Sequence, residues 1–196
     1  REPLRGSGAQ PDQIHVYEQS SIDAINAAMA ARRPLLVRGE PGTGKSQLAL
    51  AAAKTMKRPL VSQVIDGRTT AQDLLWTFDA VARLAEAQLA GALRSADKVG
   101  DEKVRELLHE KRFVTPGVLW WALNWESAEQ HAGEHKSAIP MKPEGWQVTQ
   151  GTVVLIDEID KADSDVPNGL LEVLGAGTFQ PRGYDKPFCV CGSCWP

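Results

Sequence analysis

The stretch that decides the fold of this chain runs from residue 39 to residue 46 and reads Gly39-Glu40-Pro41-Gly42-Thr43-Gly44-Lys45-Ser46. It matches the pattern G-x-x-x-x-G-K-[ST] at every fixed position. A phosphate needs a concave ring of backbone N–H donors, and glycine lets the chain curl tightly enough to supply one. We therefore expect these residues, together with Gln47, to bind a nucleotide. Lys45 would reach the β- and γ-phosphates and assist catalysis, and the Ser46 hydroxyl would bind Mg²⁺.

The residues on either side of this loop favour the same interpretation. Leu35, Leu36 and Val37 form a short apolar run that predicts a strand, and a helix is expected from Lys45 to about Lys57. The N-terminus of that helix adds a partial positive charge beside the phosphates. The alternative is a glycine-rich turn without function, which the complete pattern between a strand and a helix disfavours.

A second motif lies more than one hundred residues further on and reads Val153-Val154-Leu155-Ile156-Asp157-Glu158. A strand is expected over Thr152–Ile156, and its wholly apolar run predicts burial on both faces, as in a parallel sheet. Asp157 would then hold Mg²⁺ together with Ser46. Glu158 would act as the base that orients and deprotonates water, which indicates a hydrolase. The alternative is a solvated strand end.

Strands alternate with helices along the chain, which predicts an α/β fold with a parallel sheet. Thr70 is the expected N-cap of the longest helix, and Asp163 or Asp165 is expected to cap the last helix. The expected elements are a disordered leader over 1–13, helices over Glu18–Ala30, Ala71 to about Leu89, Glu102–Lys111, from Pro116 and from Asp165 to about Leu174, a strand over Leu60–Ile65, and loops over 91–101 and 127–150.

Composition excludes several other classes of protein. The net charge of -3 and the absence of a basic stripe argue against a nucleic-acid-binding protein. No apolar run is long enough to cross a membrane, and residues 1–13 do not form a secretory signal, so we expect a cytoplasmic location. The three cysteines all lie within residues 189–194, which excludes a disulfide scaffold for the main body.

The two motifs together resemble those of AAA+ ATPases, in which GEPGTGKS and LIDEIDKAD are typical phrases. Residues 68–76, 78–80 and 115–121 are similar to the MoxR-like branch, and the resemblance covers about residues 14–188. It implies a P-loop NTPase core, a three-layer αβα sandwich with a parallel sheet, incomplete at the C-terminus, with residues 189–196 as an irregular tail. It also implies ATP and Mg²⁺ as cofactors, a homo-oligomeric ring, and remodelling of a protein substrate or action with a co-chaperone.

The resemblance carries further implications for individual segments. Residues 15–17 would lie against adenine, and residues 92–145 would form an insertion. Residues 175–186 would form a hairpin ahead of a fourth strand, which in the family lies between the first and third. The family module then continues with a γ-phosphate sensor, an arginine finger and a helical lid, and the resemblance therefore implies that residues 14–188 are an incomplete module. Residues 188–191 therefore either form a stub of the fourth strand or leave the fragment poorly folded.

Two functions remain open at this point. One is an ATP-hydrolysing motor subunit of MoxR type, and the other is a nucleotide-binding fragment with little or no turnover. The preference for ATP over GTP is also open.

Several other residues allow both a functional and a purely structural interpretation. The three cysteines Cys189, Cys191 and Cys194 suggest an unselected tail rather than a metal site. Core packing or an oligomer contact is expected for Trp120, Trp121 and Trp125. His131 and His135 have the spacing of metal ligands on a helix but are expected in a solvated loop. Candidate contacts to a neighbouring subunit's nucleotide are Arg68, Arg83 and Arg112.

Overall fold

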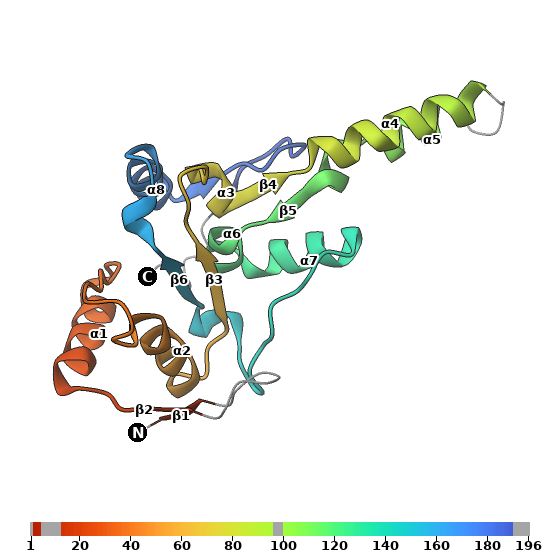
Figure 1. Cartoon of the computed structure of the whole chain (residues 1–196). Helices are drawn as coiled ribbons and strands as arrows, with labels where there is room; N and C mark the ends of the chain where they lie inside the picture. The colour runs from red at the N-terminus through yellow and green to blue at the C-terminus, as the bar shows by residue number, and fades with distance from the viewer. Residues whose placement is uncertain (1, 5–12, 96–99, 190–196) are drawn as a thin grey trace. The chain divides into compact units, whose positions relative to one another are not determined.

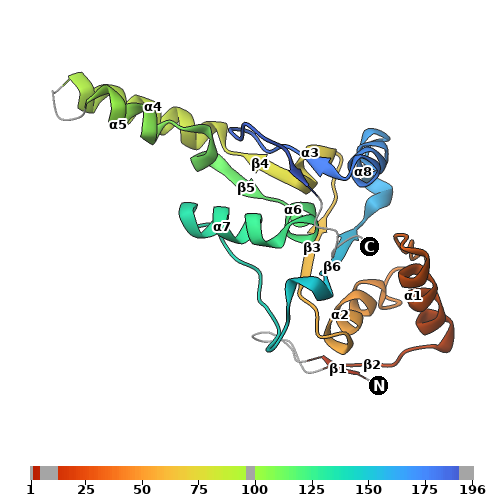
Figure 2. The same ribbon diagram turned by 180° about the vertical axis from the view of Figure 1, so that it is seen from behind.

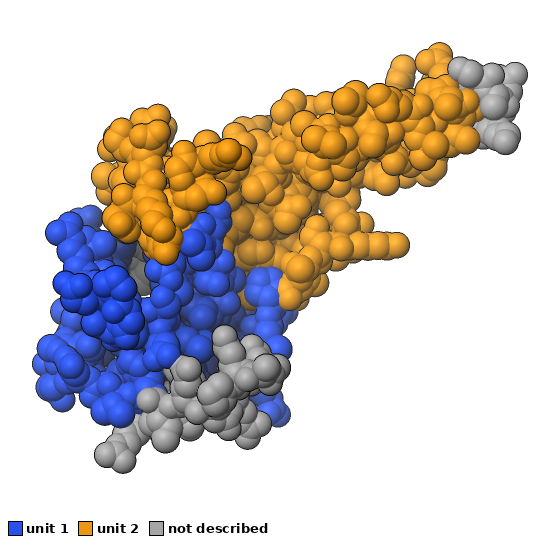
Figure 3. Space-filling model, in the orientation of Figure 1, with its two compact units in different colours: residues 1–64, 140–157, 191–196 blue, residues 65–139, 158–190 orange. Residues whose placement is uncertain are grey.

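The computed structural model describes residues 2–4, 13–95 and 100–189. The chain divides into two compact units (Figure 3). Unit 1 comprises residues 1–64, 140–157 and 191–196, and unit 2 comprises residues 65–139 and 158–190.

A parallel pair of strands is the centre of unit 1 (Figure 1). Strand β3 (Leu60–Val64) pairs with strand β6 (Val153–Asp157), with Leu60 opposite Val153 and Val64 opposite Asp157. Helix α2 (Lys45–Thr55) packs against both strands, and its residues Ala51, Ala52 and Ala53 are buried. The remaining elements of this unit are β1 (Glu2–Leu4), β2 (Gln13–His15), α1 (Gln19–Ala31) and the 3-10 turn η2 (Val148–Gln150).

The N-terminal segment contains a short ladder where the sequence predicts a disordered leader over 1–13. Strand β1 pairs antiparallel with β2, and Glu2 lies opposite His15. The other residues of the predicted leader, 1 and 5–12, lie outside the described residues.

The predicted strand over residues 35–37 is wrong. No strand is assigned there, and Leu35, Leu36 and Val37 are 41, 60 and 41% exposed. An apolar run becomes a strand only when a neighbouring strand satisfies its backbone groups. Within the described part of the chain, no strand pairs with this run.

The predicted burial of β6 on both faces is also wrong. All five residues of β6 are half-buried, although the strand itself forms within one residue of its expected bounds. The parallel sheet of the described residues has two strands, β3 and β6. So small a sheet has only one neighbouring strand to shield the apolar side chains of β6.

Unit 2 contains most of the helices, and Figure 2 shows its strands β4 and β5 side by side. Strand β4 (Trp76–Phe78) pairs antiparallel with β5 (Val114–Pro116), and β7 (Thr178–Phe179) pairs antiparallel with β8 (Phe188–Cys189). The helices are α3 (Ala71–Leu75), α4 (Ala80–Ser95), α5 (Asp101–Leu107), α6 (Val118–Leu123), α7 (Trp125–His135) and α8 (Asp165–Ala176), with 3-10 turns η1 (Glu110–Phe113) and η3 (Ile159–Lys161).

The predicted long helix over residues 71–89 is interrupted. Its start is confirmed, since Thr70 forms a capping box with Asp73. The helix ends at Leu75 because residues 76–78 pair with β5, and the Gly117 amide donates to the Leu75 carbonyl at 2.8 Å. Trp, Thr and Phe all favour strands. Helical spacing continues through this segment, so periodicity alone misses the break.

The other differences follow from contacts that are distant in sequence. Helix α7 replaces residues 127–135 of the predicted loop over 127–150, and α4 and α5 extend into the predicted loop over 91–101. The N-cap residue of α8 is Ser164 rather than Asp163 or Asp165. Within the predicted hairpin over 175–186 only β7 forms a strand, and it pairs antiparallel with β8, which lies beyond that hairpin. Among the described residues, β8 therefore does not extend the parallel sheet as the predicted stub of a fourth strand would.

An aromatic cluster around Trp120 forms the core of unit 2. Trp120 is fully buried, and its ring lies 5.8 Å from that of Phe179, 5.9 Å from that of Tyr184 and 5.5 Å from that of Phe188. Trp121 and Trp125 are also buried and contact each other at 4.9 Å. The core interpretation of these tryptophans is therefore confirmed.

The predicted solvated position of His131 is wrong, because its ring is 1% exposed within this cluster. Nε2 lies 2.8 Å from the Val114 carbonyl, which can only accept, so Nε2 carries the proton. Nδ1 therefore accepts a hydrogen bond from the Tyr184 hydroxyl at 2.7 Å. Burial lowers the pKa of His131 and raises the pKa of Tyr184 to about 12. The neutral imidazole thus joins α7, β5 and the segment between β7 and β8.

Candidate functional site

The glycine-rich loop of residues 39–44 leads directly into helix α2 of unit 1. Gly42 and Gly44 have φ angles of 82° and 85°, which lie in the left-handed region that favours glycine. Thr43 Oγ1 donates to the Glu40 carbonyl at 2.9 Å and closes the loop. Gly44 is the N-cap residue of α2, which begins at Lys45 as predicted. The loop therefore has the conformation that its glycines predict.

Lys45 folds back over the loop that precedes it. Its ammonium group donates to the carbonyl oxygens of Gly39 and Glu40, both at 2.8 Å. These two contacts place the positive charge at the N-terminus of α2, where the helix dipole also favours an anion. The side chain is half-buried, so solvent and anions can reach it. An anion bound in the loop would therefore lie close to the ammonium group of Lys45.

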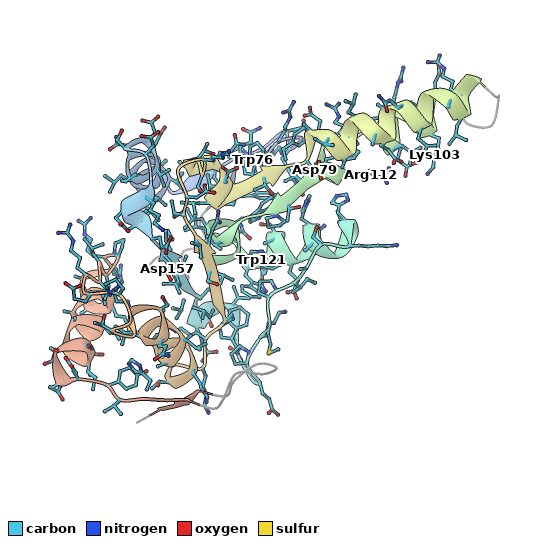
Figure 4. The ribbon with its side chains drawn as sticks, viewed as in Figure 1. Trp76, Asp79, Lys103, Arg112, Trp121 and Asp157 are labelled. Atoms are coloured by element: carbon cyan, nitrogen blue, oxygen red, sulfur yellow. The ribbon has the colours of Figure 1, made fainter. Side chains whose placement is uncertain are left out.

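Ser46 and Asp157 are in direct contact although 111 residues separate them in the sequence. The Ser46 hydroxyl donates to Asp157 Oδ2 at 2.6 Å. Asp157 is the last residue of β6, which packs against α2 (Figure 4). A hydroxyl and a carboxylate oxygen are the hard donors that Mg²⁺ prefers, and protein sites for this ion supply few ligands beyond substrate phosphates. The donor set therefore fits Mg²⁺.

Glu158 follows Asp157 and is the N-cap residue of the 3-10 turn η3 in unit 2. Its backbone is left-handed, with φ 58° and ψ 35°, which is uncommon for a residue with a side chain. Its carboxylate accepts a hydrogen bond from Lys161 Nζ, and the two groups form an ion pair. The hydrogen bond to Glu158, followed by the attraction of the Glu158 charge, raises the pKa of Lys161. Lys161 therefore stays protonated at neutral pH.

Sequence reasoning missed Lys161 as the partner of Glu158. The three-residue spacing of Glu158 and Lys161 is the one available signal, and it is weak because nothing in the sequence marks the 3-10 turn η3 that brings the two side chains together.

The remaining residues of the predicted nucleotide site lie along the same segment of unit 1. Pro41 is exposed and Gln47 is half-buried within the first turn of α2. Near the expected adenine position, the Tyr17 hydroxyl lies 3.0 Å from Thr55 Oγ1 at the end of α2. The His15 and Tyr17 rings meet edge to face at 4.9 Å, whereas Val16 is 60% exposed. Both described aromatic rings of this segment thus have partners in unit 1.

Two of the three candidate arginines are engaged inside unit 2. Arg83 donates to the Leu108 carbonyl at 3.3 Å and pairs with Glu110 at 3.4 Å. Arg112, labelled in Figure 4, donates to the Leu107 carbonyl at 2.9 Å. Arg68 lies in the exposed turn ahead of α3. Among these three, Arg68 is the candidate whose side chain forms no hydrogen bond to another described residue.

The described residues contain no group of three or more His, Cys, Asp or Glu side chains that could hold a metal ion. Cys189 is exposed, whereas Cys191 and Cys194 lie outside the described residues. The helices of the described ranges include none that is long and apolar enough to span a membrane.

Comparison with protein-family models gives one match. The model described as AAA domain (dynein-related subfamily) matches residues 34–187, a segment that includes the glycine-rich loop, Asp157 and Glu158. No curated protein and no solved structure matches the chain significantly.

Proposed function

Because this chain belongs to the AAA domain family, dynein-related subfamily, whose members in general bind and hydrolyse ATP, we propose that it binds ATP with Mg²⁺ and hydrolyses the terminal phosphate. The mixed α/β fold with a parallel strand pair agrees with the P-loop class predicted from the sequence. We further propose that the chain is a MoxR-like module, on the residue patterns of 68–80 and 115–121.

The observation that carries this proposal is the 2.6 Å contact between Ser46 and Asp157. If the glycine-rich turn had no function, we would not expect Ser46 to contact Asp157 of the second motif. The parallel pairing of β3 with β6 and the packing of α2 on β6 bring the two residues together. The contact therefore supports a shared role for the two motifs at one bound ion.

In the proposed reaction the loop amides and Lys45 bind the β- and γ-phosphates. Lys45 already points its ammonium group at the loop, so it needs only to exchange one carbonyl for a phosphate oxygen. Glu158 takes a proton from water, the water oxygen forms a bond to the γ-phosphorus, and the bond from that phosphorus to ADP breaks. Ser46 and Asp157 would hold Mg²⁺, which supplies charge neutralisation on the phosphates when bound.

We also propose that the module works in a homo-oligomeric ring on a protein partner, with neither nucleic acid nor membrane involved, in the cytoplasm. The net charge of -3 supports this view, because phosphate-backbone binding calls for a basic surface. In such a ring Arg68 is the favoured candidate for contact with a neighbouring subunit's nucleotide, since Arg83 and Arg112 already bond to acceptors in unit 2.

A second candidate function is nucleotide binding with little or no turnover. It is favoured by residues 35–37, which lead into the loop yet pair with no strand among the described residues. A loop anchored at one end only would bind phosphates with less precision, and small misplacements lower rates strongly. Binding would survive such misplacement better than catalysis.

The experiment measures ATP affinity and steady-state phosphate release for the wild-type chain, Lys45→Ala and Glu158→Gln. We expect Lys45→Ala to lose affinity, and Glu158→Gln to keep affinity while losing turnover. If Lys45→Ala binds ATP as tightly as the wild type, the proposed site is wrong. If the wild type binds ATP but releases no more phosphate than Glu158→Gln, the second candidate function is correct. Competition between ATP and GTP in the same assay measures the base preference.

A further inference from the structure

The candidate base is held by a lysine on its own turn. Lys161 Nζ donates a hydrogen bond to Glu158 Oε2, and the amide of Lys161 donates to the Glu158 carbonyl at 2.9 Å. Both contacts belong to η3, a one-turn 3-10 helix in which side chains three residues apart lie over one another. The backbone and the side chain of Lys161 thus fix Glu158 together.

The backbone of Glu158 strengthens this restraint. Its left-handed conformation is unfavourable for a residue with a Cβ atom and persists only where the surrounding structure imposes it. This backbone conformation fixes the direction in which the Glu158 side chain leaves the main chain. The Glu158 carboxylate then lies against the ammonium group of Lys161. The carboxylate orientation is therefore a property of the turn as well as of Glu158.

A carboxylate oxygen that accepts a hydrogen bond from an ammonium group has less capacity to accept one from water. Glu158 Oε2 is engaged in this way, so Lys161 competes with the attacking water for this oxygen. We propose that Lys161 is a positioning residue that restrains Glu158, and that turnover is faster when the carboxylate exchanges Lys161 for the attacking water. This inference rests on the proposed ATP hydrolysis.

The ion pair between Lys161 and Glu158 is weak enough to break and form again. The side chains of Lys161 and Glu158 are 57% and 46% exposed, and exposed ion pairs are weak and are screened by salt. Releasing such a pair shifts the population of free carboxylate by about two- to fivefold. Lys161 remains charged throughout the neutral range because its pKa is raised by the hydrogen bond to Glu158 and by the charges of Glu158 and Asp160. Both partners of the ion pair therefore stay charged at neutral pH, and the strength of the pair falls as salt rises.

The test compares Lys161→Met, which removes the charge and keeps the length of the side chain, with Lys161→Arg, which keeps the charge. At low salt we expect kcat of Lys161→Met to rise about two- to fivefold over the wild type, with KM for ATP unchanged. Lys161→Arg is expected to stay near the wild type. Raising the ionic strength is expected to raise wild-type kcat toward that of Lys161→Met, because the ion pair is screened. A role in folding alone would not produce this salt dependence.

The double variant Glu158→Gln with Lys161→Met separates this proposal from the proposed function. The gain in kcat must disappear in the double variant, since it acts through Glu158. A kcat of Lys161→Met equal to or below that of the wild type overturns the restraint, as does a gain that persists in the double variant. If the wild type binds ATP but shows no turnover above Glu158→Gln, the proposed hydrolysis is wrong and the restraint, which rests on it, is wrong with it; a wild type that turns over without a gain in Lys161→Met overturns the restraint alone.

Discussion

Replacing His131 with Leu is expected to destabilise unit 2 by about 1–3 kcal/mol at pH 7.5. The variant removes the donor to the Val114 carbonyl, and that carbonyl belongs to a residue only 1% exposed. A buried acceptor without a partner costs about 1–3 kcal/mol. Tyr184 also loses the acceptor for its hydroxyl, although this half-buried group can turn to water. Tyr184→Phe, which removes only that second bond, is expected to cost about 0.5–1.5 kcal/mol.

The cost of the His131 substitution is expected to depend on pH. Burial lowers the folded-state pKa of His131 below the unfolded value near 6.5. At pH values between the folded and the unfolded pKa of His131, the unfolded chain binds more protons than the folded chain. The free energy of unfolding therefore falls as pH falls. The stabilisation is fully present above about pH 6.5 and is lost as pH drops toward the folded pKa. The difference between wild type and His131→Leu should therefore be largest at pH 7.5 and smaller at pH 5.

The assay is urea unfolding followed by tryptophan fluorescence at several pH values, because Trp76, Trp120, Trp121 and Trp125 all lie in unit 2. His135 needs a control, since burial lowers its pKa as well and its ring lies 4.6 Å from that of His131. His135→Asn is expected to leave the pH-dependent difference between wild type and His131→Leu in place. A His131→Leu variant as stable as the wild type, or a difference independent of pH, would refute the reasoning.

Three further predictions follow from single contacts. Gly117→Ala is expected to cost about 1–3 kcal/mol, because a Cβ there would lie 2.5 Å from the Leu74 carbonyl oxygen, whereas Gly91→Ala in open space on α4 is expected to stabilise by about 0.5–1 kcal/mol. Equal urea midpoints for the two variants would contradict this. Thr70→Ala is expected to cost about 0.5–2 kcal/mol through loss of the α3 cap, measured in the same assay against an unchanged result for an exposed Ser20→Ala control. Ser46→Ala is expected to lower the Mg²⁺-dependent part of the ATP affinity about tenfold, or about 1.4 kcal/mol, by titration with and without EDTA; an unchanged effect of EDTA would argue against Ser46 as a ligand.

The parts of the fold that depend on neighbouring residues could be predicted from the sequence. Helix α2 begins at Lys45 as expected because Gly44 supplies the left-handed cap, and α3 begins after Thr70 because its hydroxyl reaches the third amide of the helix. Strands β3 and β6 form within one or two residues of their expected bounds, because short apolar runs between turns favour strands. Each of these features requires only residues a few positions apart.

The candidate site also contains parts that the sequence predicts and a part that it does not. The glycine-rich loop and the paired acidic residues could be read as motifs, and the direct contact between Ser46 and Asp157 follows from the alternation of strands and helices. The ion pair of Glu158 with Lys161 could not be predicted with the same ease, because η3 and the left-handed Glu158 have no strong sequence signal. Asp, Asn and Gly favour that conformation, whereas Glu does not.

The sequence by itself determined where α2 and α3 begin, which residues form the glycine-rich loop, and that the motifs belong to the AAA+ ATPases. Only the tertiary structure decided that residues 76–78 leave the helical pattern to pair with β5, that His131 is buried against Tyr184, and that residues 35–37 remain without a paired strand. The physical reason is that strand pairing and burial are satisfied by groups far away in the chain. A local pattern records the preference of a segment, but the partner that meets the preference appears only when the chain is folded.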